Sequence, residues 1–283
     1  MWNKHTETFI GCDCDFTAGK TVLLGAPFDC TTSNRPGARF APSAMRKESW
    51  GLETYSPYQD KDLSDCFVFD GGDIELPFGN PEPALAMLEE KAEEIFTAEK
   101  RPFLIGGEHL VSLAAIKAAV KKHPDLHIIH FDAHADLRDD YLGQSLSHAT
   151  VMRRAWDILG DGRIFQFGIR SGDREEFLWA KEHVQMQKFN FTGLEETVKS
   201  LAGKPVYLSI DLDVLDPSVF PGTGTPEAGG VSFVKLLNAT LYVLKHSDVV
   251  ACDLVELAPN YDPSGVSTAT ACKLMREMLI ALA

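Results

Sequence analysis

The most unusual residues in this chain are acids and a histidine that alternate after an apolar segment. Asp132, His134 and Asp136 follow the segment that ends at Phe131. In an extended segment, residues two apart share a face, so these three side chains can converge. Two carboxylates and an imidazole that converge repel one another and lose hydration unless a cation balances them. The run therefore predicts a metal site, although it could also be a loop of solvated acids with a capping aspartate.

A second pair of acids repeats this arrangement. Asp211 and Asp213 lie two residues apart at the end of another apolar segment, Val206–Ile210. Such a pair is common by chance and is weak support when taken alone. Because ligands of parallel sheets bind beyond the carboxyl ends of the strands, two clusters at two strand ends are better explained by one shared site.

Two glycines and a histidine form the third motif. Gly106 and Gly107 follow the apolar segment Phe103–Ile105, and Glu108 and His109 then open a helical pattern. The glycines permit a tight turn and a close approach of the backbone. His109 could be an ordinary residue at a helix start, with Glu108 as a favourable charge near the helix N-terminus. Beside the two acidic clusters, His109 is also a candidate metal ligand.

The charges of these candidates favour two divalent cations. Four aspartates supply four negative charges, which two divalent ions would cancel, and two histidines supply neutral nitrogen ligands. The six candidates are Asp132, Asp136, Asp211, Asp213, His109 and His134. Ligands rich in carboxylate and free of thiolate suit a hard ion such as Mn²⁺ better than Zn²⁺. Two ions about 3.5–4 Å apart can share and activate a water, so the residues predict a hydrolase with two Mn²⁺ ions per chain.

These motifs need a scaffold in which strands alternate with helices. Short apolar segments bounded by Gly, Pro or polar residues predict strands at Thr21–Leu24, Phe103–Ile105, His127–Phe131, Ile164–Phe167, Val206–Ile210 and Val249–Val255. Helical periodicity predicts helices after the cap Asn80 through Phe96, and at Leu110–Lys121, Arg174–His183, Leu194–Leu201, Phe233–Lys245 and Thr268–Leu282. This alternation predicts an α/β protein with a doubly wound parallel sheet, and we expect one domain over residues 1–283.

Composition narrows the functional class. The chain has 283 residues, of which 45% are hydrophobic and 24% charged, as in ordinary globular proteins. No apolar run approaches the roughly 18–20 residues that span a bilayer, and the first 20 residues do not read as a secretory signal. We therefore expect a cytoplasmic protein, with no membrane partner and with six free cysteines. A net charge of −14 argues against binding nucleic acid and is compatible with a cationic substrate.

Three of these motifs, in this order, resemble the metal-binding signatures of the ureohydrolase family, which includes arginases and agmatinases. The matching segments are Gly106–His109, Asp132–Asp136 and Ser209–Asp213. Asp216 and Pro217, followed by Pro221–Glu227, resemble the agmatinase branch, and bacterial agmatinases of clostridial type in particular. The resemblance runs from about Gly25 to the C-terminus.

This resemblance implies a role for each candidate residue. His109 would bind one manganese ion and His134 the other, and the four aspartates would bridge or complete the pair. His148 would transfer protons beside the metals, Glu256 would pair with the guanidinium group of a substrate, and Thr225 would contact the substrate with them. The implied fold is a three-layer α/β/α sandwich with a largely parallel sheet of about eight strands. The implied assembly is a homo-oligomer, either a trimer or a hexamer.

The implied reaction is hydrolysis of a guanidinium group by a hydroxide that bridges the two metals. The loop after Asp136 holds two adjacent acids, Asp139 and Asp140, which favour an ammonium tail and hence agmatine, cleaved to putrescine and urea. Arg138 leaves an acidic tail open, so guanidinobutyrate, aminopropyl-agmatine and arginine are alternatives. A single-zinc amidase of deacetylase type is a further alternative, against which the six ligands argue. A binding protein without catalysis is another, against which His148 and Glu256 argue.

Overall fold

A sheet of eight parallel strands runs through the molecule. The computed structural model describes residue 2 and residues 7–283. The strand order is β4-β1-β5-β10-β9-β6-β7-β8, and every neighbouring pair is parallel. The strands are β1 (Thr21–Ala26), β4 (Val68–Asp73), β5 (Arg101–Gly106), β6 (His127–Phe131), β7 (Ile164–Ile169), β8 (Gln185–Lys188), β9 (Pro205–Asp211) and β10 (Asp248–Val255). A separate antiparallel hairpin pairs β2 (Tyr55–Ser56) with β3 (Lys61–Asp62).

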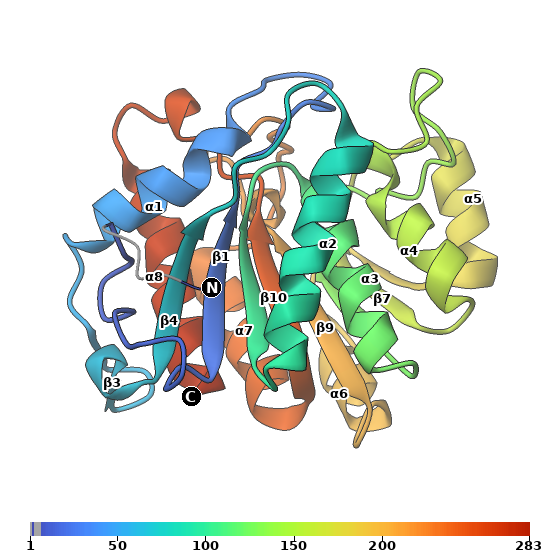
Figure 1. Ribbon diagram of the computed structural model, residues 1–283. Helices are drawn as coiled ribbons and strands as arrows, with labels where there is room; N and C mark the ends of the chain where they lie inside the picture. Colours follow the sequence, from blue (N-terminus) through green and yellow to red (C-terminus); the bar gives the residue numbers. More distant parts are fainter. Residues whose placement is uncertain (1, 3–6) are drawn as a thin grey trace.

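Helices cover both faces of this sheet. One face carries α2 (Pro81–Thr97), α3 (Ser112–Lys122), α4 (Val151–Leu159) and α5 (Arg174–His183), and the other carries α1 (Ala41–Ser49), α6 (Leu194–Ser200), α7 (Phe233–His246) and α8 (Val266–Leu282). Figure 1 shows α2 and α3 in front of the sheet and α7 and α8 behind it. Short 3-10 turns lie at Ala38–Phe40, Leu63–Asp65, His109–Val111, His148–Thr150, Leu212–Val214 and Pro259–Tyr261. The predicted three-layer α/β/α sandwich is confirmed.

Strand residues alternate between the two core layers. On β6, Ile128 packs in the layer beneath α3 and α4, whereas Ile129 packs in the layer beneath α7 and α8. On β5, Leu104 packs in the same layer as Ile128, and Phe103 packs in the same layer as Ile129. Because both faces are covered, the strands are apolar at successive positions, as expected of a parallel sheet.

Every strand and helix predicted from the sequence is present, with ends that differ by no more than a few residues. The sequence patterns missed the hairpin strands β2 and β3, the sheet strands β4 and β8, and the helices α1 and α4. The two strands missed in the eight-stranded sheet lie at its edges, and their sequences, VFDGGD and QMQK, lack a continuous apolar run. An edge strand needs fewer apolar residues because one side of it has no neighbouring strand. None of the helices formed by residues 7–283 combines the length and apolar character needed to cross a bilayer.

The four central strands bring the predicted motifs together. In the order β5-β10-β9-β6, the neighbouring residues in register are Ile105, Leu254, Ile210 and Phe131. Each is followed, within a few residues, by one of the polar motifs seen in the sequence. Motifs separated by up to about 150 residues along the chain therefore leave the sheet side by side at one edge.

A buried aspartate anchors the start of α8 to the loop that carries Thr225. Asp262 Oδ2 accepts hydrogen bonds from the backbone N–H and the hydroxyl of Ser267, each 2.7 Å long. The Ser267 hydroxyl oxygen in turn accepts the Gly222 N–H at 2.9 Å. Burial raises the pKa of Asp262, but the hydrogen bonds from Ser264 and Ser267 outweigh it and lower the pKa to about 2.

Replacement of Asp262 by asparagine is expected to lower the free energy of unfolding by about 1–2 kcal/mol at pH 7. The pKa is lower in the folded chain than the roughly 3.9 of an unfolded aspartate, so the ionised group stabilises the fold above about pH 4. This contribution is lost as the pH falls through 2. Urea unfolding of wild type and Asp262→Asn at pH 7 and pH 3 should show a smaller difference at pH 3. An equal loss in Asp65→Asn, an exposed control, would contradict the assignment.

Candidate functional site

All six predicted ligands meet in one cluster beyond the carboxyl ends of β5, β6 and β9. The four aspartates and His109 are buried, and His134 is half-buried. Nδ1 of His109 lies 3.1 Å from Asp132 Oδ2, 3.0 Å from Asp136 Oδ2 and 3.4 Å from Asp211 Oδ2. Nδ1 of His134 lies 2.9 Å from Asp213 Oδ2 and 3.6 Å from Asp132 Oδ1. Asp132 thus faces both histidines.

The hydrogen bonds of His109 place a proton on Nε2 and leave Nδ1 directed at the carboxylates. The Ser209 hydroxyl donates to Asp253 Oδ1 at 2.9 Å, so its oxygen can only accept from His109 Nε2, also at 2.9 Å. The proton of the neutral ring is therefore on Nε2, by inference from this network. Nδ1 has no hydrogen-bond partner although three carboxylates surround it. Burial lowers the pKa of His109, but Asp132, Asp136 and Asp211 outweigh it and raise the pKa well above its usual range. A positive charge is therefore stabilised between Nδ1 and the carboxylates, and these residues fit a metal ion.

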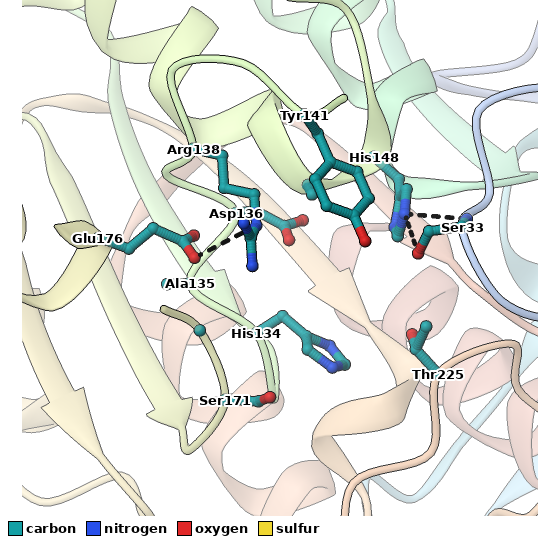
Figure 2. Close-up of a pocket in the computed structure, with 12 residues that line it drawn as sticks. Ser33, His134, Ala135, Asp136, Arg138, Tyr141, His148, Ser171, Glu176 and Thr225 are labelled. Atoms are coloured by element: carbon teal, nitrogen blue, oxygen red, sulfur yellow. Dashed lines mark hydrogen bonds and ion pairs between the residues drawn. The ribbon is translucent and has the colours of Figure 1, made fainter. Parts of the chain in front are cut away.

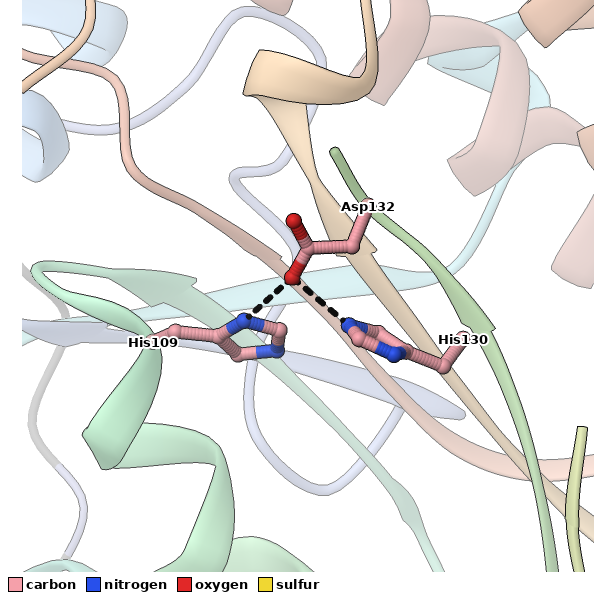
Figure 3. Close-up of side chains that lie close together, drawn as sticks. All are labelled: His109, His130 and Asp132. Atoms are coloured by element: carbon pink, nitrogen blue, oxygen red, sulfur yellow. Dashed lines mark hydrogen bonds and ion pairs between the residues drawn. The ribbon is translucent and has the colours of Figure 1, made fainter. Parts of the chain in front are cut away.

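His130 lies behind this cluster and was missed by the sequence patterns. Its Nε2 is 2.8 Å from Asp132 Oδ2, so this oxygen lies between the rings of His109 and His130 (Figure 3). The Gln166 amide donates to the Ala135 carbonyl at 2.6 Å and lies 3.1 Å from His130 Nδ1, so Nδ1 accepts and Nε2 donates to Asp132. His130 thus orients a candidate ligand. The sequence signal that could have revealed His130 is its position two residues before Asp132, which places the two side chains on the same face of the strand.

The carboxylates of the cluster disturb one another strongly. Burial, together with the charge of Asp132, raises the pKa of Asp136 to about 7. Burial, followed by the charges of Asp213 and Asp132, raises the pKa of Asp211 well above its usual range. Burial also acts on Asp132, but His130, His109 and His134 outweigh it and hold its pKa well below the usual range. Such a group of acids needs positive charge among them to stay ionised at neutral pH.

Two residues of the site have left-handed backbone conformations that side chains rarely adopt. Asp136 has φ 53° and Glu256 has φ 65°. The Asp136 carbonyl accepts the N–H groups of Met152 and Arg153, and the Glu256 N–H donates to the Gly107 carbonyl at 3.0 Å. These bonds hold both residues in conformations that cost about 1–3 kcal/mol each, which is typical of functional sites.

The glycine pair before His109 allows two loops to touch. A Cβ atom at Gly107 would lie 1.9 Å from the Phe28 carbonyl oxygen, so only glycine fits there. The predicted close approach is confirmed. Glu108 does lie at the start of the turn His109–Val111, but its side chain makes no capping bond and instead accepts hydrogen bonds from Thr31 and Thr32. Burial raises the pKa of Glu108 to about 7, against the lowering effect of the Thr31 and Thr32 bonds.

A cavity of about 240 Å³ opens beside the cluster. Its lining residues include His134, Asp136 and Thr225 of the candidate site, together with Arg138, Tyr141 and Glu176 (Figure 2). The Thr225 hydroxyl lies 3.3 Å from Asp213 Oδ2, so this residue touches a candidate ligand as well as the cavity.

His148 and Glu256, the two residues expected to act on a substrate, lie in different places. His148 lines the cavity, and its Nε2 is 3.0 Å from the Ser33 hydroxyl and accepts the Ser33 N–H at 3.3 Å. Burial, reinforced by His134 and His109, lowers the pKa of His148 to about 4. Glu256 is buried and is not among the residues that line the cavity, and its Oε1 accepts the His109 N–H at 2.8 Å. Burial, then the charge of Glu108, raises the Glu256 pKa.

The loop acids thought to face the substrate do not line the cavity. Asp139 pairs with Arg154 at 2.7 Å on the surface, and Asp140 accepts the Gly143 N–H within the loop. That prediction is wrong, because the two acids point to solvent and to their own turn. Glu176, which the sequence patterns missed, lines the cavity instead.

Arg138, which lines the cavity, is held by two acids. Its Nη1 lies 2.8 Å from Asp173 Oδ2, its Nε lies 3.6 Å from Glu176 Oε2, and its guanidinium lies 4.8 Å from the centre of the Tyr141 ring. Asp173 and Glu176 form the capping box that begins α5. The sequence held one signal for these two acids, because they form a capping pair directly after the strand that neighbours β6.

Comparisons with known proteins agree with this geometry. The sequence profile described as "Arginase family" matches residues 19–281. An agmatinase from Bacillus subtilis is 50% identical over 97% of this chain and 96% of its own length. The crystal structure of a putative agmatinase from Clostridium difficile is 51% identical, covers 95% of this chain and 98% of its own, and superposes with a TM-score of 0.92. The agmatine ureohydrolase of Thermoplasma volcanium is 31% identical, covers 98% and 94%, and has a TM-score of 0.89.

Proposed function

Because this chain belongs to the arginase family, we propose that it is an agmatinase, which hydrolyses agmatine to putrescine and urea with two bound Mn²⁺ ions. The observation that carries the proposal is the position of His109 Nδ1, which faces three carboxylates within 3.4 Å. The high identity to agmatinases over nearly the whole chain supports the choice of reaction.

The six clustered residues would hold the metal pair. The ligand atoms of Asp132, His134 and Asp213 lie within 4.8 Å of one another, and Asp132 also faces His109, so Asp132 is suited to bridge two ions. The remaining carboxylates, Asp136 and Asp211, complete the His109 side. Oxygen-rich ligation supports Mn²⁺ over Zn²⁺. When bound, two such ions supply an activated water and stabilise developing negative charge.

Protein groups beside the cluster would bind and orient the guanidinium group. No described residue donates a hydrogen bond to Glu256 Oε2, so this oxygen is available to a planar cation, while Oε1 stays bonded to the His109 backbone. A substrate held in one orientation beside the metals reacts as if the step were intramolecular. His148, on the cavity wall, would give a proton to the departing amine.

The end of the cavity at Arg138 favours an ammonium tail over a carboxylate tail. Glu176 lines the cavity beside Arg138, and Asp173 pairs with Arg138 from outside the lining. Arg138 is already paired, so a substrate carboxylate would have to compete with two acids for it. Agmatine ends in an ammonium group and therefore fits this end better than guanidinobutyrate.

Urea release from Mn²⁺-loaded protein tests the proposal, with agmatine, arginine and guanidinobutyrate compared side by side. We expect kcat/KM for agmatine to exceed the others by at least about tenfold, a difference of about 1.4 kcal/mol in transition-state stabilisation. Protein stripped of metal by a chelator is the control and should be inactive. A higher kcat/KM for arginine or guanidinobutyrate would contradict the assignment of agmatine as the substrate. No urea from any of the three would contradict the proposed function.

A further inference from the structure

Glu108 is a buried acid of the site for which the proposed reaction has no use. It is 0% exposed and precedes His109, but its carboxylate makes all its hydrogen bonds to the loop after β1. Oε1 accepts the Thr31 hydroxyl at 2.6 Å, and Oε2 accepts the Thr31 N–H at 2.9 Å and the Thr32 hydroxyl at 3.1 Å. Three donors thus converge on one buried carboxylate, which fixes this loop relative to the start of the His109 segment.

The same loop holds His148 at two points. The His148 N–H donates to the Thr31 hydroxyl oxygen at 3.0 Å. Two residues on, Ser33 contacts the ring at Nε2 through its N–H and its hydroxyl, at 3.3 and 3.0 Å (Figure 2). A backbone N–H can only donate, so Nε2 is the acceptor and the neutral ring carries its proton on Nδ1. The loop therefore determines both the place of His148 and which nitrogen is protonated.

The direction of each bond in this chain is set by Glu108. A carboxylate only accepts, so the single Thr31 proton goes to Oε1, and the Thr31 oxygen is left free to accept the His148 N–H. An uncharged amide at position 108 would change this direction. With its oxygen toward the Thr31 N–H, its NH₂ group would donate to the Thr31 hydroxyl oxygen, and the Thr31 proton would lose its acceptor. In the other orientation the NH₂ group would face the Thr31 N–H, which is also a donor, and that bond would be lost.

We propose that Glu108 is a positioning residue for His148, and that it acts through the Thr31 hydroxyl and the backbone of the loop Thr31–Ser33. The inference rests on the proposed function for its kinetic meaning, since His148 is the proton donor there. It adds a residue that touches neither the substrate nor the metal-facing atoms of the site. The same acid that lies next to His109 in the chain thereby keeps the proton-transfer histidine at the cavity wall.

Valine in place of Thr31 tests this with little change of shape, because only the bridging hydroxyl is replaced by a methyl group. In Mn²⁺-loaded protein, Thr31→Val is expected to lower kcat for agmatine at least tenfold, with KM and bound manganese within twofold of wild type. Thr31→Ser restores the hydroxyl and should recover kcat to within threefold. If Thr31→Val does not fold, Thr31→Ala, which removes the same hydroxyl, takes its place, with the same expected pattern.

Thr32→Val is the matched control. It removes one hydrogen bond to the same carboxylate oxygen pair but leaves the bridge from Glu108 through Thr31 to His148 intact. Its kcat should stay within threefold of wild type. An unchanged kcat in Thr31→Val, or an equal fall in Thr32→Val, would overturn the inference, because the effect would then be absent or would belong to the loop in general.

A second measurement does not depend on turnover. Diethyl pyrocarbonate modifies unprotonated imidazole nitrogens, and its rate at His148 can be followed by peptide mass spectrometry. We expect the rate to rise at least threefold in Thr31→Val and to remain at the wild-type value in Thr32→Val, because only the first variant releases the ring from Ser33. Equal rates in all proteins would overturn the positioning role. Inactive wild-type protein with the expected labelling pattern would instead overturn the proposed function alone.

Discussion

Alanine at position 134 is expected to abolish urea release from agmatine, with a fall in kcat of at least about 1000-fold, and to leave no more than one manganese ion per chain. Nδ1 of His134 lies 2.9 Å from Asp213 Oδ2 and 3.6 Å from Asp132 Oδ1, so its loss removes a ligand between two acids. The side chain is half-buried at the cavity, so the fold should tolerate the change. Steady-state kinetics and elemental analysis of dialysed protein measure the two effects.

His246→Ala is the matched control for this variant. His246 is exposed on the last turn of α7, where its Nδ1 contacts only the Tyr242 carbonyl, and its replacement should alter neither activity nor metal content. Full activity in His134→Ala would show that the residue is not a ligand. Lost activity with two ions still bound would limit its role to the substrate side of the cavity.

Glutamine in place of Glu256 is expected to lower kcat/KM for agmatine about 100- to 1000-fold while the bound manganese stays unchanged. The amide oxygen can still accept the His109 N–H, which Oε1 accepts at 2.8 Å in the native chain, so the local structure is retained. The negative charge opposite the guanidinium is lost, and removing a charge-assisted pair of this kind costs about 3–4 kcal/mol. The kinetic constants for agmatine and the metal content together measure this.

Glu195→Gln makes the same chemical change on the exposed face of α6 and should leave both quantities at their wild-type values. A loss of manganese from Glu256→Gln in proportion to its loss of activity would contradict a role toward the guanidinium. It would place Glu256 in the metal centre instead, where it neighbours Asp211 and Asp213.

Much of the scaffold could be predicted from local patterns. The central strands are apolar at most positions because helices cover both faces of the sheet, and this produces the short apolar runs that locate β6 and β9. Each run ends in acids and histidines at alternate positions, so the side chains that share a face could be named before the strand order was known. The edge strands β4 and β8 lacked this signal because solvent and loops border them.

Other parts of the site depended on contacts between distant segments. Arg138 is paired by Asp173 and Glu176, about 35 residues further along the chain, and this pairing decides the charge that a substrate tail meets. Glu108 has the pattern of a helix-start acid, yet its partners lie in the loop after β1. Asp139 and Asp140 have the charge that suits an ammonium tail, but their side chains do not face the cavity, and a loop sequence alone does not reveal the direction of a side chain.

The sequence by itself determined which side chains would share a face at each strand end, because backbone alternation is a local property of two or three residues. It also determined the family, through several spaced motifs. Only the tertiary structure decided which strand ends are neighbours, which nitrogen of His109 faces the carboxylates, and which charges reach the cavity. These depend on the order and register of β5, β10, β9 and β6, and therefore on hydrogen bonds and packing between segments far apart in the chain.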